Sequence, residues 1–414
     1  MTRFGALVER VDLKRPGADL PLLSVSQTRG VLRRSELTDT PARAESLDHY
    51  KTCQEGDIVF NKMSVRAGAM GVASEPGYIT YHYEVMRPRH GVDPRFVVYL
   101  MKSEWFTSEM VRRERGIAAG DDSGSVRTTE VPFKVLKTID VPVPSADGQV
   151  AIADFLDRET AQIDAFIAKN EELVTLLTER RATVVDTRVF GLRDGDAAER
   201  VIPEFVSQSA AIRDFIARMP STWSVGRFKA LTKRLDTRNA NSAAAMKSLT
   251  VSGEVVPRSS KQNPDESSIP RYLLVSPGDL VVNPMWLVGG SIGVSNAHGA
   301  VSPDYRVFRL RPAIHDRYLH HAMRSRPYRR QYELFTRAET TFDRRVSQSD
   351  LDRLPIPLPD IDEQVEIARA IDSELAHIDK TIEVARTSVD LARERRAALI
   401  SAAVTGKISV GVDA

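Results

Sequence analysis

Residues 56–63, GDIVFNKM, and residues 278–285, GDLVVNPM, are two copies of one sequence pattern. They lie 222 residues apart (278 − 56). Further along, the segments VPVP and IPLP are followed by Gln149 and Gln364, which lie 215 residues apart (364 − 149). Solenoid repeats have periods of about 20–50 residues. A period this long therefore indicates a duplicated domain followed by a duplicated tail.

Each copy predicts the same order of secondary structure around this pattern. A Gly-Asp turn leads into an apolar run, IVFN or LVVN, which is typical of a buried strand. In the first copy a glycine-rich turn (66–71), an alternating strand (79–88) and an amphipathic helix (94–114) follow. A proline-punctuated edge strand ends the copy. The distance in sequence between corresponding residues falls from 222 to 215 before this strand, so the first copy has a longer loop there. Loops are where function can vary on a fixed scaffold.

Two long helices are predicted at 146–190 and 361–404, because both segments carry heptad-like apolar spacing over about five heptads. Each segment ends near a glycine, Gly191 or Gly406, as expected for a C-terminal cap. At about 1.5 Å per residue each helix would be about 60 Å long. An amphipathic helix must bury its apolar stripe, and the simplest partner is its own duplicate in antiparallel orientation.

The sequence therefore predicts an α+β fold with pseudo-two-fold symmetry. Two tandem α/β domains would be separated by a pair of long antiparallel coiled-coil helices. The predicted segments are a first domain at 1–145, a central helix at 146–190, a linker at 191–219, a second domain at 220–360, a C-terminal helix at 361–404 and a tail at 405–414.

Composition narrows the class of protein. The chain of 414 residues has one cysteine, Cys53, so a disulfide framework is excluded and a reducing compartment is expected. Neither a signal peptide nor an apolar stretch of about 18 residues is visible, so we expect a soluble cytoplasmic protein. The net charge is only +2, but residues 220–358 carry 21 Lys and Arg against 12 Asp and Glu. Residues 146–190 carry 5 against 9, so a basic patch on the second domain can coexist with an acidic helix.

The tails and the start of the second domain carry a family resemblance. Residues 142–167 read PVPSADGQVAIADFLDRETAQIDAFI, and residues 357–382 read PLPDIDEQVEIARAIDSELAHIDKTI. Their continuations carry ERR and end in FGL or VTGKI, and MPSTW stands at 219–223. With these motifs the whole chain resembles the specificity (S) subunit of type I restriction–modification enzymes. The first domain departs from the family because it lacks a Pro-x-x-Trp opening, so either the native start lies upstream of Met1 or this member does without that segment.

The resemblance implies a non-catalytic subunit of a restriction endonuclease and adenine methyltransferase complex. Each α/β domain would be a target recognition domain that reads one half of a bipartite site in double-stranded DNA. The helices would space the domains and dock two modification (methyltransferase) subunits, which recruit restriction (translocase–nuclease) subunits. The chain itself would hold no cofactor, with S-adenosylmethionine, ATP and Mg expected on the partner subunits, and no membrane partner is expected.

Two other classes were weighed, a stand-alone methyltransferase or nuclease and a coiled-coil scaffold without DNA binding. Asn283-Pro-Met-Trp286 resembles the Asn-Pro-Pro-Tyr loop of amino-methyltransferases, but its duplicate reads Asn61-Lys-Met-Ser64, so a strand end is the simpler interpretation. The segment 288–293, VGGSIG, lacks the full dinucleotide-binding spacing and favours a tight turn. No catalytic or metal-binding residue is therefore predicted.

The candidate DNA-binding residues lie on the segments between the predicted elements, where cations and hydrogen-bond donors can reach phosphates and base edges. They are Lys62, Arg66, Arg112, Arg113, Arg127, Arg329, Arg330, Arg344, Arg345 and Ser347. Some of the arginines could instead cap a helix or pair with Glu109, Glu114 or Glu333. For partner binding the candidates are Gln149 and Gln364, which could alternatively cap the long helices or hydrogen-bond within the chain.

Overall fold

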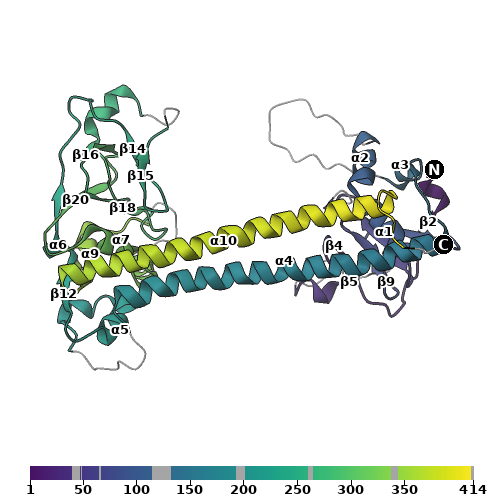
Figure 1. Cartoon of the computed structure of the whole chain (residues 1–414), viewed down its shortest axis with the longest axis horizontal. Helices are drawn as coiled ribbons and strands as arrows, with labels where there is room; N and C mark the ends of the chain where they lie inside the picture. Colours follow the sequence, from purple (N-terminus) through teal and green to yellow (C-terminus); the bar gives the residue numbers. More distant parts are fainter. Residues whose placement is uncertain are drawn as a thin grey trace. The chain divides into compact units, whose positions relative to one another are not determined.

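The computed structural model describes residues 1–39, 47, 49–64, 67–113, 132–192, 201–259, 264–336 and 344–411. The chain divides into two compact units. Unit 1 is Met1–Glu171 together with Arg386–Ala414, and unit 2 is Glu172–Ala385. Each unit combines a sheet-containing domain with one part of each long helix (Figure 1).

Unit 1 is built on a four-stranded antiparallel sheet with smaller β-pieces beside it. Its order is β2 (Val8–Val11), β10 (Tyr83–Pro88), β7 (Ile58–Asn61) and β8 (Met70–Val72). A three-stranded sheet has the order β3 (Leu13–Lys14), β6 (Lys51–Cys53) and β9 (Gly77–Ile79). The pairs are β4 (Leu23–Ser26) with β5 (Gly30–Arg33), and β1 (Thr2–Arg3) with β11 (Asp140–Val141).

Unit 2 repeats this topology. Its four-stranded sheet has the order β13 (Thr232–Leu235), β20 (Arg306–Leu310), β17 (Leu280–Val282) and β18 (Ile292–Val294). The pairs are β16 (Leu273–Val275) with β19 (Gly299–Val301), β14 (Lys247–Leu249) with β15 (Val255–Pro257), and β12 (Ser224–Arg227) with β21 (Pro355–Leu358). The predicted α+β class, with two tandem α/β domains and long helices, is confirmed.

Helices cover the sheet in each unit. Unit 1 has α1 (Pro94–Lys102), α2 (Glu104–Arg113) and α3 (Phe133–Leu136). Unit 2 has α5 (Ala210–Arg218), α6 (Phe228–Leu231), α7 (Asp316–Arg324), α8 (Arg326–Phe335) and α9 (Gln348–Arg353). Short 3-10 turns lie at Phe4–Ala6, Arg34–Glu36, Glu204–Val206 and Glu266–Arg271. Helix α1 begins where the Asp93 side chain accepts hydrogen bonds from the backbone N–H groups of Arg95 and Phe96.

Strand alternation gives each sheet two apolar faces. In β7 of unit 1, Ile58 and Phe60 pack in the same core as Phe96 and Leu100 of α1. Val59 between them belongs to a second core on the opposite face. The duplicate strand β17 distributes its residues in the same way between two cores. The period of two along a strand therefore accounts for the apolar runs IVFN and LVVN, whose residues are buried on both faces.

The repeated Gly-Asp has the same structural role in both units. Gly56 and Gly278 have φ of 82° and 84°, in the left-handed region that favours glycine. The buried Asp57 accepts a hydrogen bond from Gln54 N at 2.8 Å and forms an ion pair with Arg87. Asp279 in unit 2 likewise accepts from a backbone N–H of its turn and pairs with an arginine of β20. The motif that defines the repeat therefore joins a turn to the central strand.

The long helices are α4 (Ala146–Val189) and α10 (Ile361–Val404), each 44 residues long. In unit 1 the first part of α4 pairs with the last part of α10, through Asp164 with Arg396 and Glu171 with Arg393. In unit 2 the last part of α4 pairs with the first part of α10, and Val184, Ile378 and Ile382 form an apolar cluster between them. The paired segments run in opposite directions within each unit, as the sequence predicted. None of the helices among the described residues is long and apolar enough to span a membrane.

Candidate nucleic-acid interface

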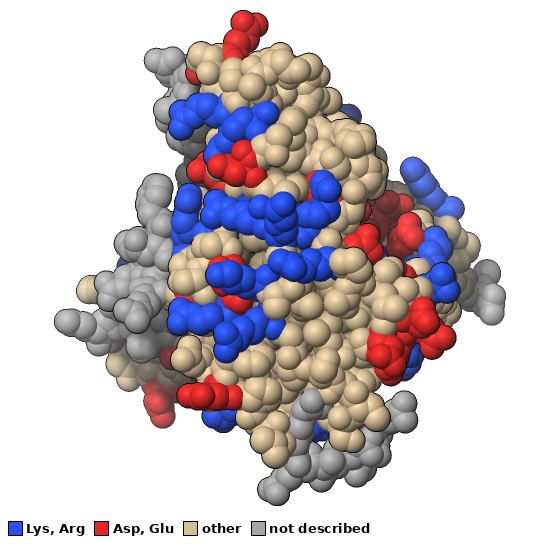
Figure 2. Space-filling model, turned by 90° about the vertical axis from the view of Figure 1, so that its left-hand side faces the viewer, with Lys and Arg blue, Asp and Glu red and all other residues tan. Residues whose placement is uncertain are grey.

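Cations gather on one face of unit 2. Figure 2 shows Lys and Arg side chains in bands on the face that lies at the left of Figure 1. In this unit the neighbouring strands β13 and β20 carry Arg234 and Arg306 on one face of the sheet and Lys233 and Arg309 on the other. Arg309 is paired with Asp279. The other three have no carboxylate within ion-pair distance among the described residues, so this edge of the sheet carries excess positive charge.

Arg306 is the unusual member of this group because it is buried and one of its guanidinium nitrogens is unsatisfied. It is only 8% exposed, and its Nη1 has no hydrogen-bond partner among the described residues. Cross-strand register places Arg234 opposite Phe308, two residues from Arg306, so both arginines lie on the same sheet face. Burial, followed by repulsion from Arg234 and Arg345, lowers the pKa of Arg306 to about 10, so the side chain remains charged at pH 7.

The segment before the edge strand brings Arg345 into this group. Val346 N donates a 3.1 Å hydrogen bond to Pro284 O, which holds this segment against the turn after β17. That turn carries Trp286, whose side chain is 53% exposed. Arg345 has one ion pair, with the exposed Asp304 at 3.6 Å. An exposed indole beside several guanidiniums provides stacking area and positive charge, the two features that nucleic-acid surfaces combine.

Unit 1 has the opposite charge at the same place. The residue of β10 that corresponds to Arg306 is Glu84, which is 5% exposed. Glu84 forms ion pairs with Arg10 Nε at 2.9 Å and with Lys51 Nζ at 3.2 Å. Arg10 occupies the register position that Arg234 holds in unit 2. The same corner of the sheet is therefore neutralised in unit 1 and left positive in unit 2.

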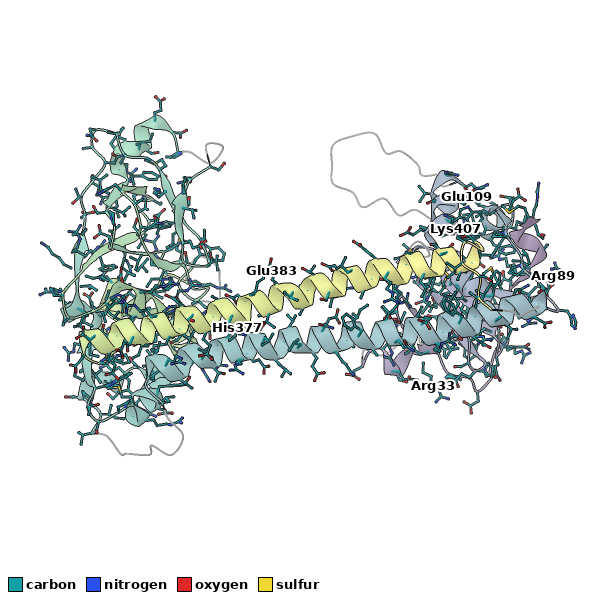
Figure 3. The ribbon with its side chains drawn as sticks, viewed as in Figure 1. Arg33, Arg89, Glu109, His377, Glu383 and Lys407 are labelled. Atoms are coloured by element: carbon teal, nitrogen blue, oxygen red, sulfur yellow. The ribbon has the colours of Figure 1, made fainter. Side chains whose placement is uncertain are left out.

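The residues predicted in unit 1 do not form one cluster. Lys62 lies in the turn after β7. Arg112 and Arg113, at the end of α2, both pair with Glu109, which is labelled in Figure 3. These ion pairs lower the pKa of Glu109. Pairing with Glu109 is the alternative to DNA binding that the sequence left open for these two arginines. Arg66 and Arg127 lie outside the described residues.

The residues predicted in unit 2 divide between two places. Arg344 and Arg345 lie beside the Trp286 turn, and Arg329 Nε donates a 2.8 Å hydrogen bond to Val288 O in the same β17–β18 connection. Arg330 lines a separate cavity of about 540 Å³ that also contains Asp186 and Asp214.

The remaining residue predicted in unit 2 is Ser347, which caps α9. Its Oγ accepts from Asp350 N at 3.1 Å. The hydroxyl therefore has a local structural role, and its binding to DNA stays a prediction.

Gln149 and Gln364 are both buried, at 3% and 0% exposed. Gln149 accepts from Asp93 N at 3.2 Å and donates to Pro144 O at 3.1 Å. Gln364 accepts from His315 N at 2.8 Å and donates to Ala313 O and Pro359 O. Each amide thus ties the start of a long helix to the segment before α1 or α7. This geometry favours the hydrogen-bonding role within the chain over direct contact with a partner.

The motifs considered for catalysis form turns. Asn283 Oδ1 accepts from Met285 N at 3.2 Å, and Asn61 Oδ1 accepts from Met63 N at 3.0 Å. Both asparagines therefore end a strand with the same side-chain turn. Among the described residues, no three His, Cys, Asp or Glu side chains gather in a way that could hold a metal ion.

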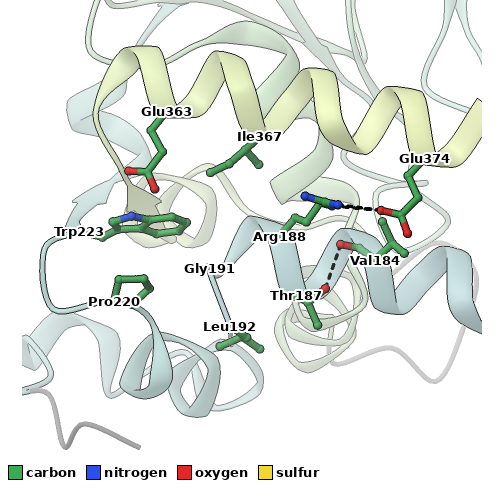
Figure 4. Close-up of a pocket in the computed structure, with 10 residues that line it drawn as sticks. All are labelled: Val184, Thr187, Arg188, Gly191, Leu192, Pro220, Trp223, Glu363, Ile367 and Glu374. Atoms are coloured by element: carbon green, nitrogen blue, oxygen red, sulfur yellow. Dashed lines mark hydrogen bonds and ion pairs between the residues drawn. The ribbon is translucent and has the colours of Figure 1, made fainter. Parts of the chain in front are cut away.

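A cavity of about 400 Å³ in unit 2 lies where the end of α4 meets the start of the second domain (Figure 4). Its lining residues serve to pack this helix end. Pro220 and Trp223, from the MPSTW segment, pack against Gly191 at the end of α4. Gly191 has φ of 61°, and a Cβ there would lie 2.8 Å from both Pro220 and Trp223. The Pro-x-x-Trp motif therefore packs the start of the second domain onto the helix end.

Sequence reasoning missed Arg234 and Arg306, which lie on strands and not on connecting segments. A usable signal was present, because position 84 in the first copy is Glu and position 306 in the second copy is Arg. A charge reversal between duplicated positions marks a place where the two copies differ in more than loop length.

Comparisons with known proteins agree with this architecture. Residues 23–175 match the family model described as the type I restriction modification DNA specificity domain. The HsdS subunit from Thermoanaerobacter tengcongensis matches with a TM-score of 0.53 and 15% identity, covering 98% of this chain and 96% of that chain. A chain from a type I R-M system, solved to explain complex assembly and conformational transition, matches with a TM-score of 0.61 and 15% identity, covering 98% and 97%. No curated protein matches this chain significantly in sequence.

Proposed function

We propose that this chain, which belongs with the specificity (S) subunits of type I restriction–modification enzymes by its fold and by the match of residues 23–175, reads a bipartite DNA site. Each unit would read one half of the site. The chain would perform no chemistry itself. S-adenosylmethionine, ATP and Mg would be bound by modification and restriction subunits, which act on the DNA that this chain selects.

The observation that carries this proposal is the repetition of one sheet topology with different surface chemistry. The orders β2–β10–β7–β8 and β13–β20–β17–β18 are the same. The charged residues on them differ, as the buried Glu84 and Arg306 show. Two copies of one scaffold with unlike surfaces suit two half-sites of unlike sequence, because base-edge contacts depend on the side chains that each unit presents.

The long helices support docking of modification subunits. Within unit 1, Phe166 of α4 and Leu391 of α10 are 47% and 59% exposed. Within unit 2, Leu176 and Val384 are 55% and 54% exposed. Apolar side chains left exposed on helices that already pack with each other are available for contacts with another protein. We infer that two modification subunits dock on these helices, one for each recognition unit.

A domain exchange tests the reading of half-sites. Residues 220–358 would be replaced by the corresponding segment of another S subunit, and the complex with modification subunits would be assayed by sequencing its methylated sites. We expect one half-site to change while the other half-site is retained. A control exchange between two identical segments should leave both halves unchanged. A change in both half-sites, or in neither, would contradict the proposal.

The helices would also set the spacing between the half-sites. Insertion of the same number of whole helical turns into α4 and α10 is expected to lengthen the spacer of the recognised sequence, because an α-helix rises about 1.5 Å per residue. Methylation of the original spacing by the lengthened protein would rule out this role of the helices.

A further inference from the structure

A buried guanidinium with an unsatisfied nitrogen is a costly feature. Arg306 is only 8% exposed, and its Nη1 has no hydrogen-bond acceptor among the described residues. An unsatisfied buried donor, and more so one that belongs to a charged group, destabilises the folded state. Such a group in a native fold calls for an explanation, and one explanation is a ligand that supplies the missing acceptor.

The neighbours of Arg306 show the kind of ligand. Arg234 and Arg345 both repel its charge, and among the described residues Asp352 attracts it. That carboxylate also accepts a 2.7 Å hydrogen bond from Gln348 Nε2. Two further carboxylates near this corner are also engaged, Asp304 with Arg345 and Asp236 with Arg238. The described carboxylates here are thus already paired or hydrogen-bonded, which favours an anionic ligand for the arginines.

A DNA phosphate fits this site better than a base edge. A phosphate carries a full negative charge and several acceptor oxygens, and it suits guanidinium groups geometrically. A base edge is uncharged and would leave the repulsion among Arg234, Arg306 and Arg345 uncompensated. Trp286 and Arg345 lie on the surface next to this corner, so a bound DNA strand could reach it while contacting them.

We propose that Arg306, with Arg234 and Arg345, binds a phosphate of the DNA backbone in the half-site read by unit 2, and that unit 1 lacks an equivalent site. This inference rests on the proposed function in DNA recognition. In unit 1 the corresponding place holds Glu84, which already neutralises Arg10 and Lys51. The two halves of the chain would therefore hold DNA unequally, with unit 2 supplying a larger electrostatic share.

The test uses the complete complex with its modification subunits and a duplex that contains the recognised sequence. The dissociation constant of the Arg306→Gln complex would be measured over a range of salt concentrations by fluorescence anisotropy. We expect binding about tenfold weaker than wild type, because one hydrogen-bonded charge contact is lost. The slope of log affinity against log salt concentration should fall in magnitude by about 0.9, as for one phosphate.

Arg306→Glu is the second variant, because unit 1 shows that this fold accepts a glutamate there. A glutamate at 306 can pair with Arg234 as Glu84 pairs with Arg10. It should bind DNA more weakly than Arg306→Gln, while its melting temperature stays at or above the wild-type value. Arg218→Ala, an exposed arginine on α5, is the charge-matched control and should leave the salt slope unchanged.

A methylphosphonate scan identifies the contact. Neutralising single phosphates of the second half-site should weaken wild-type binding at one position, and Arg306→Gln should be insensitive at that same position. If both variants kept the wild-type affinity and the wild-type salt dependence, the inference would be overturned. It would also be overturned if a variant lost its preference at one base pair while the salt dependence stayed the same. Failure of the wild-type complex to select any sequence would instead overturn the proposed function.

Discussion

Glu84 in unit 1 and Arg306 in unit 2 occupy the same position of the same strand in a duplicated sheet. Glu84 is enclosed by two cations, whereas Arg306 is surrounded by two further arginines. Other positions were kept, since Asp57 with Arg87 and the equivalent pair in unit 2 join the same turn to the same strand. The Asp–Arg ion pairs present in both units therefore maintain the scaffold. The position where a buried charge is balanced in unit 1 but not in unit 2 is where the units can differ in function.

The largest expected effect comes from removing the compensating charge in unit 1. Glu84→Ala would remove the buried carboxylate that Lys51 and Arg10 share and leave them, among the described residues, only the exposed Asp12, at 3.7 Å from each. Breaking a buried ion pair by deleting one partner costs about 3–5 kcal/mol. Urea unfolding, with hydrogen exchange of unit 1 peptides to locate the loss, would measure this change.

The matched variant in unit 2 is Arg306→Met, which keeps much of the side-chain volume. It removes an unpaired charge, so it should cost less than about 1 kcal/mol or raise the stability of unit 2. Equal destabilisation by the two variants would show that the two positions are energetically alike, against the comparison drawn here.

A smaller effect concerns pH, at the duplicated pair Lys102 and Arg324. Burial, with repulsion from Arg396, lowers the pKa of Lys102 to about 8. The folded state then binds this proton less tightly than the unfolded state, so stability rises as the pH increases from about 8 to about 10.5. At about 1.4 kcal/mol per pKa unit the rise is up to about 3 kcal/mol. The pKa of Arg324 is lowered only to about 10, so that residue stays mostly protonated through most of this window.

Lys102→Met isolates this contribution. We expect the variant to be more stable than wild type at pH 7 and to lose the advantage by about pH 10.5. Urea unfolding of both proteins at pH 7, 9 and 10.5 gives the difference, which cancels the titration of other groups. A stability difference that does not change with pH would show that Lys102 is solvated in the folded protein.

The last comparison concerns the two helix ends. Gly191→Ala places a Cβ 2.8 Å from Trp223 and Pro220 in addition to the left-handed backbone, and should cost about 2–4 kcal/mol. Gly406 has φ of 71° with nothing within 4 Å of a Cβ, so Gly406→Ala should cost about 1 kcal/mol. Thermal unfolding measures both, and equal costs would contradict the packing role of the Pro-x-x-Trp motif in unit 2.

One segment of the candidate site could be predicted from the sequence because it lies before a recognisable edge strand. Arg344 and Arg345 were identified in this way, and the structure places Arg345 beside Arg306 and Arg234. Ser347 illustrates a limit, because a hydroxyl that could reach DNA is also a good helix cap, and the sequence does not choose between these roles. Arg306 was missed because a cation in an alternating strand is typical of a solvent-facing position.

The sequence by itself determined the duplication, the buried strands and the two long helices, because each depends on local periodicity and on glycines or prolines at fixed places. Only the tertiary structure decided which charges are compensated. Arg10 and Glu84 are 74 residues apart in the chain, yet their side chains pair at 2.9 Å. Electrostatic energy depends on distance and burial in space, so the balance at Glu84 and the excess at Arg306 are set by folding.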